Sequence, residues 1–188
     1  IAYLPNLASQ KENMLSKSIY SFKTEIERCK ILNIPYLVIH SGSYKGGTFE
    51  SGFATYVDTI LKGIEVAEGK VQILVENTAG EKNSITDKFE HIERVLKEIN
   101  DSSAVGTCFD TCHAFVAGYD MRDKKSVNTT VKKMEETFGI DSLKVIHAND
   151  AKGELGSNLD RHEHLGLGNI GEEGFKALIN HSKLINKP

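Results

Sequence analysis

The sequence has few cysteines, no long apolar run and no excess of charge of either sign. Its three cysteines, Cys29, Cys108 and Cys112, cannot form a disulfide framework in 188 residues, which indicates a reducing compartment. No apolar run approaches the roughly 20 residues of a membrane span, and no charged-then-apolar leader opens the chain. We therefore expect an intracellular protein without membrane contact, cytoplasmic in a bacterium and nuclear or organellar in a eukaryote.

Net charge does not identify the partner. The chain has 23 Lys and Arg against 26 Asp and Glu, a formal net charge of −3, and so has no strongly basic character of the kind typical of nucleic-acid-binding domains. Two or three bound divalent cations would make the sum positive. No Pro- or Ser-rich linker divides the chain, so we expect a single domain over residues 1–188.

Four short apolar runs each end on a side chain that can bind a metal. They are residues 36–40, 71–76, 105–110 and 143–147, which end on His40, Glu76, Asp110 and His147. The segments between them, and residues 15–29 and 175–179, carry apolar residues at helical spacing. This alternation predicts an α/β fold in which parallel strands direct their last residues into one mouth of a TIM-type (β/α)8 barrel. A doubly wound sheet shares the alternation but brings strand ends together only around its switch point. Because a whole barrel needs about 250 residues, we expect this one to be incomplete.

Two further units add candidate ligands from the loops. Asp110 is followed three residues later by His113, either as two ligands or as a helix N-cap followed by a surface histidine. Asp160 and His162 are two residues apart, so in an extended loop they face the same side. Carboxylates and imidazoles without thiolates suit Zn²⁺, with Mn²⁺ or Fe²⁺ as alternatives.

We expect the remaining cysteines and histidines to have structural roles. Cys108 and Cys112 alternate with Asp110 and are expected to pack into the barrel wall. His91 and His181 lie on helical segments and are expected at the surface. The connection from Asp150 to Gly171 is long and rich in glycine, and a connection of that length is more often functional than idle.

With these residues assembled, the chain closely resembles the endonuclease IV family, the zinc-dependent apurinic/apyrimidinic endonucleases of base-excision repair. The matching segments are Tyr3-Leu-Pro-Asn-Leu-Ala8, His40-Ser-Gly-Ser43, Glu76-Asn-Thr-Ala-Gly80, Phe109-Asp-Thr-Cys-His-Ala-Phe115, Ala117-Gly-Tyr-Asp120, His147-Ala-Asn-Asp-Ala-Lys152, Gly156-Ser-Asn-Leu-Asp-Arg-His162 and Gly166-Leu-Gly168. They occur in the family's order. The resemblance implies a xylose-isomerase-like barrel and a monomer that binds double-stranded DNA containing abasic sites.

The resemblance also implies a role for each residue. His40 matches a ligand of the first of three zincs, and Glu76 matches the carboxylate that bridges the first two and takes part in catalysis. Asp110 and His147 match ligands of the second zinc. The set His113, Asp160 and His162 matches the ligands of the third. Tyr3 and Leu4 match a minor-groove wedge that opens the base stack, so that the abasic nucleotide can rotate into the pocket. The implied reaction is hydrolysis of the phosphodiester 5′ to the abasic site.

Two family ligands have no counterpart here. The family has a His just before its opening segment and a Glu in a Leu-Glu-Thr-Pro strand near its end, whereas this chain runs from Ile1 to Pro188. We therefore expect a fragment that lacks the first strands and the last strand of the barrel. Two other functions compete with the nuclease. One is a metal-dependent sugar isomerase or epimerase of the same barrel group, against which Asp160, His162 and the wedge argue. The other is a fragment that binds DNA without cleaving it.

Overall fold

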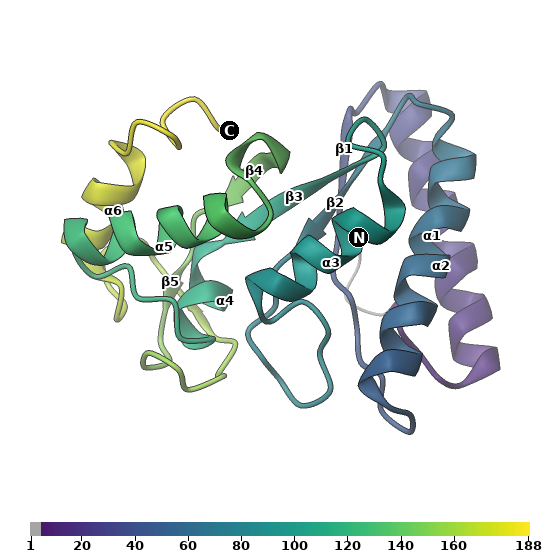
Figure 1. The fold of residues 1–188 in the computed structure, drawn as a ribbon, viewed down its shortest axis with the longest axis horizontal. Helices are drawn as coiled ribbons and strands as arrows, with labels where there is room; N and C mark the ends of the chain where they lie inside the picture. The colour runs from purple at the N-terminus through teal and green to yellow at the C-terminus, as the bar shows by residue number, and fades with distance from the viewer. Residues whose placement is uncertain (1–4) are drawn as a thin grey trace.

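The computed structural model describes residues 5–188 and contains a four-stranded parallel sheet with its strands in sequence order (Figure 1). The strands are β1 (Tyr36–Ile39), β2 (Gln72–Glu76), β3 (Val105–Asp110) and β4 (Leu143–His147). The longer helices are α1 (Glu12–Leu32), α2 (Phe49–Ala67), α3 (Phe89–Ile99), α5 (Lys124–Thr137) and α6 (Gly171–Ile179). Parallel neighbours that are consecutive in sequence and joined by helices form a segment of a (β/α) barrel, as the sequence predicts.

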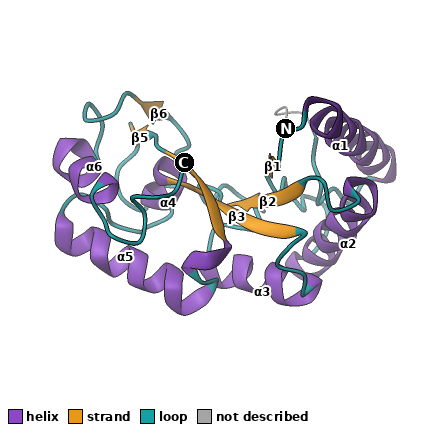
Figure 2. Ribbon diagram, turned by 90° about the horizontal axis from the view of Figure 1, so that it is seen from above, coloured by secondary structure: helices purple, strands orange, loops and turns teal. Residues whose placement is uncertain are grey.

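The two faces of the sheet have different surroundings. Figure 2 shows the helices in an arc around the strands. Ile39, Ile73 and Val75 belong to the core that the helices share with the sheet. The strand register puts Leu74 and Val145 on the opposite face, the inner wall of a barrel. Glu76, Asp110 and His147 are on this inner face as well, because they follow Leu74, Cys108 and Val145 by two residues in the same register.

Local sequence explains several helix ends. Before α2, the Thr48 hydroxyl accepts a hydrogen bond from the Ser51 backbone N–H, and the Ser51 hydroxyl accepts one from Thr48 in return. This reciprocal capping satisfies donors that the first turn leaves free. Asn33 and Asn100 end α1 and α3 in the left-handed conformation, with φ of 55° and 51°. Asn tolerates that conformation better than most residues do.

The predicted strands agree with the structure to within one residue at each end, but two predicted loops contain secondary structure. Helix α4 (Thr111–Val116) directly follows β3, and all six of its residues are buried. A helix without a polar face shows no amphipathic period, so the pattern could not reveal it. The connection after β4 holds an antiparallel pair, β5 (Asp150–Ala151) with β6 (His162–Glu163). Two residues per strand are too few for alternation to be recognised. A short 3₁₀ turn, η1 (Ile140–Ser142), precedes β4.

None of the helices within residues 5–188 is both long enough and apolar enough to cross a membrane.

Candidate metal centre

The four strand-end residues lie at one edge of the sheet and on its inner face. Asp110 is the register partner of His147, and Glu76 is the partner of Cys108, two residues before Asp110. His40 follows β1 directly. Because residues two apart on a strand face the same side, the architecture alone brings these side chains to one place.

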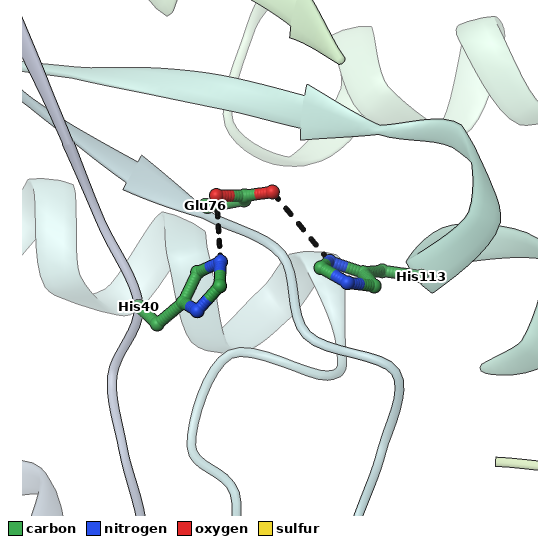
Figure 3. A group of neighbouring side chains, drawn as sticks. All are labelled: His40, Glu76 and His113. Atoms are coloured by element: carbon green, nitrogen blue, oxygen red, sulfur yellow. Dashed lines mark ion pairs between the residues drawn. The ribbon is translucent and has the colours of Figure 1, made fainter. Parts of the chain in front are cut away.

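The Glu76 carboxylate contacts three histidines, and Figure 3 shows it between the imidazoles of His40 and His113. One carboxylate oxygen, Oε2, is 2.9 Å from His40 Nε2. The other, Oε1, is 2.9 Å from His147 Nδ1 and 3.6 Å from His113 Nδ1. Burial raises the pKa of the Glu76 carboxyl, but hydrogen bonds from His147 and His40 outweigh it and bring the pKa to about 2. Glu76 is therefore a permanently charged acceptor, suited to two cations or to two imidazoles.

The structure supports only half of the structural interpretation of Asp110 and His113, namely the helix cap. Asp110 is the N-cap of α4, since its Oδ1 accepts the backbone N–H of His113 at 2.9 Å. His113 is not the surface histidine of the structural interpretation, because only 4% of it is exposed. Its Nδ1 lies 2.9 Å from the backbone oxygen of Asn77, to which it can donate. That bond leaves Nε2 as the nitrogen that faces the loop after β4.

His113, Asp160 and His162 form a triangle of donor atoms. His113 Nε2 and His162 Nε2 are 3.4 Å apart, and Asp160 Oδ1 lies 3.4 Å from the first and 3.3 Å from the second. A tetrahedral zinc with ligand bonds of about 2.0–2.1 Å would separate its ligand atoms by about 3.3–3.4 Å. The three atoms therefore match one face of a zinc coordination shell. We refer to them below as the donor triangle.

All seven side chains line one cavity of about 260 Å³. Its described lining consists of these seven with Val38 and Asn149, and includes no Lys or Arg. Three carboxylates without a basic residue would repel an anionic substrate, whereas bound cations would reverse the sign of the local field. The donor set therefore fits divalent metal ions, and oxygen with imidazole nitrogen fits zinc.

Glu76 and His113 have large pKa shifts between pH 2 and 9, and in protein prepared without metal these shifts make stability depend on pH across that range. Burial lowers the pKa of His113, but the carboxylates of Asp160, Asp110 and Glu76 outweigh it and raise the pKa from 6.5 to about 9. Its stabilising contribution is therefore complete below pH 6.5 and is lost as the pH rises through 9. The contribution of Glu76 is complete above pH 4.5 and is lost as the pH falls through 2.

We thus expect the unfolding midpoint of the metal-free protein to be highest between pH 4.5 and 6.5. Zinc needs a neutral imidazole, so zinc affinity should rise with pH up to about 9, the pKa of His113. Thermal unfolding across this range, with and without zinc, measures both effects. A midpoint that does not change between pH 6.5 and 9 in the metal-free protein would contradict the expectation.

The cysteines near the site are buried thiols. Cys108 Sγ lies within 4.8 Å of a donor atom of Glu76 and of His147, and Cys112 Sγ has the same relation to Asp110 and His162. Burial, together with the nearby carboxylates, raises the pKa of Cys108, and it raises that of Cys112 to about 12. Thiols this hard to ionise are poor metal ligands. Both cysteines are buried, in line with the expected packing role.

Two asparagines with structural roles in the site were not singled out from the sequence. Asn77 donates to the backbone oxygen of Asp110 at 2.9 Å and accepts from its backbone N–H at 2.8 Å. Asn149 Nδ2 donates to Asp110 Oδ2 at 2.6 Å. Each lies one or two residues after a strand-end candidate, Glu76 or His147. That position is the only sequence signal that could have indicated them.

Two other histidines, His91 and His181, lie away from this cavity. Both lie at the surface and are half-buried there, and His91 Nδ1 lies 3.0 Å from Asp87 Oδ1. Part-burial of His91 follows from its packing on Phe49, with 4.7 Å between ring centroids. Tyr3 and Leu4, the expected wedge, lie outside the described residues.

Known proteins are similar to this chain in sequence and in fold. The family described as xylose isomerase-like TIM barrel matches residues 1–186. "Probable endonuclease 4" of Nitrosopumilus maritimus (strain SCM1) is 46% identical over 188 residues, which cover 98% of this chain and 65% of that protein. The crystal structure of endonuclease IV from Thermus thermophilus superposes with a TM-score of 0.87 at 30% identity, covering 99% of this chain and 64% of that one.

A more distant neighbour shares the fold alone. The crystal structure of a D-tagatose 3-epimerase-like protein matches with a TM-score of 0.73 at 22% identity, covering 95% of this chain and 62% of that one. The chain spans 65% to 66% of the length of the curated relatives that it matches first. The chain belongs to the xylose isomerase-like TIM barrel family and, within it, to the endonuclease IV family.

Proposed function

We propose that the protein is a DNA-repair endonuclease that uses three zinc ions to hydrolyse the phosphodiester bond 5′ to abasic sites in duplex DNA. The observation that carries the proposal is that the donor triangle lies in the same cavity as Glu76 and the two histidines that contact it, His40 and His147. Three donor sets in one cavity, two of which share Glu76, suit a reaction in which several charged oxygens must be held together. The relatives named endonuclease 4 support the same assignment.

The assignment of residues to ions follows the resemblance to the endonuclease IV family, and the contacts between the donor atoms are compatible with it. His40 and Glu76 would hold the first zinc, and Glu76, Asp110 and His147 the second. The donor triangle would hold the third. When bound, zinc supplies Lewis-acid polarisation of phosphoryl oxygens and makes water a nucleophile near neutral pH.

The side chains around these donors orient them and move protons. Glu76 stays ionised, so it can accept a hydrogen bond from attacking water and fix the orientation of that water. Asn149 fixes one oxygen of Asp110, and the cap of α4 fixes the other. The Asn77 backbone oxygen sets the tautomer of His113, which leaves its Nε2 available to a metal. Bond cleavage would leave a 3′-hydroxyl and a 5′-deoxyribose phosphate.

Recognition of the damaged strand belongs to the same proposal. Duplex DNA with an abasic site is the partner, and insertion of Tyr3 and Leu4 into the minor groove would open the stack beside the lesion. An abasic nucleotide rotates out easily because it has no base to unpair or unstack. We propose that the protein acts as an intracellular monomer.

The test is incision of a duplex that carries one synthetic abasic site, with an undamaged duplex of the same sequence as control. We expect the full-length protein to cut only the damaged strand, on the 5′ side of the lesion, with close to three zincs bound per chain. Product ends identify the bond that is broken. Absence of incision together with one or two bound ions, and turnover of a ketohexose, would replace the nuclease with an epimerase.

A further inference from the structure

Asp150 is a buried carboxylate that the proposed reaction does not use. It is 0% exposed, and no Lys, Arg or His within residues 5–188 forms an ion pair with it. Its partners are backbone N–H groups. Oδ1 accepts from Ala151 at 2.8 Å and Ile170 at 2.9 Å, and Oδ2 accepts from Gly166 at 3.0 Å, Gly168 at 3.0 Å and Gly171 at 3.2 Å. Five backbone donors converging on one carboxylate can offset its burial without a counter-charge.

These bonds close the loop that carries two of the three ligands of the donor triangle. Ala151 pairs with His162 in the β5–β6 ladder, and the Ala151 backbone oxygen accepts from Asn169 at 2.8 Å on its other side. The segment 166–171 therefore returns to Asp150 only a few residues after His162. A side chain at Gly168 would place its Cβ 2.5 Å from Asp150 Oδ1, so the close approach requires glycine there.

His162 depends on this backbone because its own side chain has little packing. It is an exposed residue, with 44% of the side chain accessible, whereas His113 is buried and held by Asn77. Upstream of it, Asn158 Nδ2 donates to the backbone oxygen of Ala79 at 2.8 Å. Downstream of His162, the Asp150 carboxylate fixes the loop by accepting backbone N–H groups from the segment 166–171. The 3.4 Å separation of the two imidazole nitrogens is therefore set largely by the loop.

We propose that Asp150 is a positioning residue for the third metal, because its carboxylate fixes the loop that brings Asp160 and His162 to His113. The inference rests on the proposed metal-dependent function. Outer partners of metal ligands typically contribute about 10–100-fold to metal affinity. Asp150 would not contact a ligand side chain. It would act through the loop backbone on two ligands of the same metal, Asp160 and His162.

The test is zinc binding to the full-length protein, measured by competition with a chromophoric chelator. His162→Ala identifies the zinc equivalent that belongs to the donor triangle. Asp150→Asn keeps the shape of the side chain but directs an NH2 group at two or three backbone N–H donors. We expect Asp150→Asn to weaken binding of that same equivalent by about 10–100-fold and to leave the other equivalents unchanged. The double variant should bind no less zinc than His162→Ala alone.

The matched control is Asp101→Asn. Asp101 is exposed and also accepts backbone N–H groups, from Ser103 and Ala104, but it lies at the opposite end of β3. It should bind zinc like the wild type. If Asp150→Asn does not fold, Asp150→Glu keeps the charge but moves the carboxylate by one CH2 group, and it should weaken binding of the same equivalent.

The outcomes separate the two proposals. Loss of zinc equally from all sites in Asp150→Asn, or additive loss in the double variant, would make Asp150 merely structural. Wild-type zinc binding in a folded Asp150→Asn, with one equivalent lost in His162→Ala, would overturn this inference alone. If His162→Ala binds as much zinc as the wild type, that result would contradict both the proposed third metal site and this inference.

Discussion

Glu76→Gln is expected to abolish incision of abasic-site DNA while the protein remains folded. The amide has almost the same volume, and the backbone oxygen of residue 76 keeps its hydrogen bond from Thr86 at 2.7 Å. It removes the one charge that both His40 and His147 contact, and it presents NH2 to one of them. Metal activation of the nucleophile contributes several kcal/mol, and each 1.36 kcal/mol is a factor of ten in rate, so we expect a loss of about 10³-fold or more.

Single-turnover incision at saturating enzyme measures this loss in the chemical step. Glu163→Gln is the matched control, because Glu163 lies in β6 beside His162 but outside the described lining of the cavity. It should cut at close to the wild-type rate. Incision by Glu76→Gln within about tenfold of wild type, a difference of only 1.36 kcal/mol, would remove Glu76 from the mechanism.

Removal of metal should have an effect of comparable size. The described lining of the cavity has three carboxylates and no Lys or Arg, so the metal-free protein has little there to attract a phosphodiester or to stabilise its transition state. We expect dialysis against a chelator to reduce incision by about 10³-fold or more and to lower the unfolding midpoint near pH 8. Zinc should restore both, and Mn²⁺ or Fe²⁺ should restore them in part.

The control for chelation is the same chelator saturated with zinc, which should leave incision unchanged. Returning each metal separately to the stripped protein measures how far incision depends on the identity of the ion. A stripped protein with less than one-tenth of an equivalent of any transition metal that still cuts at the wild-type rate would refute the metal-dependent mechanism.

The strands and the convergence of their ends could be predicted because a strand that is buried on both faces is a nearly continuous apolar run in the sequence. Residues 105–110 show it most clearly, since every residue of β3 is buried and the first acid comes at the end. Helix α4 gave no such signal, because all of its residues are buried too, in a segment that starts with Thr, Cys and His. Composition could not distinguish it from a loop.

Within the site, the candidate ligands could be predicted from the sequence, but the groups that orient them could not. His40, Glu76, Asp110 and His147 follow from strand periodicity, and Asp160 with His162 from their spacing of two. Asn77 and Asn149 act through hydrogen bonds to Asp110 and His113, which lie more than 30 positions away in the chain. An amide has no periodicity of its own, so such a partner is known only once the strands are placed side by side.

The two uses of Asp110 restrict how this centre could be redesigned. One oxygen caps α4 while the other accepts from Asn149 beside the candidate ligands. Any attempt to change metal selectivity by exchanging Asp110 for His or Cys would remove the cap as well, at a typical cost of about 1 kcal/mol. It would also release the start of the helix that positions His113. An engineer would have to supply another cap first, so position 110 is a poor starting point and His147, outside any helix, is a better one.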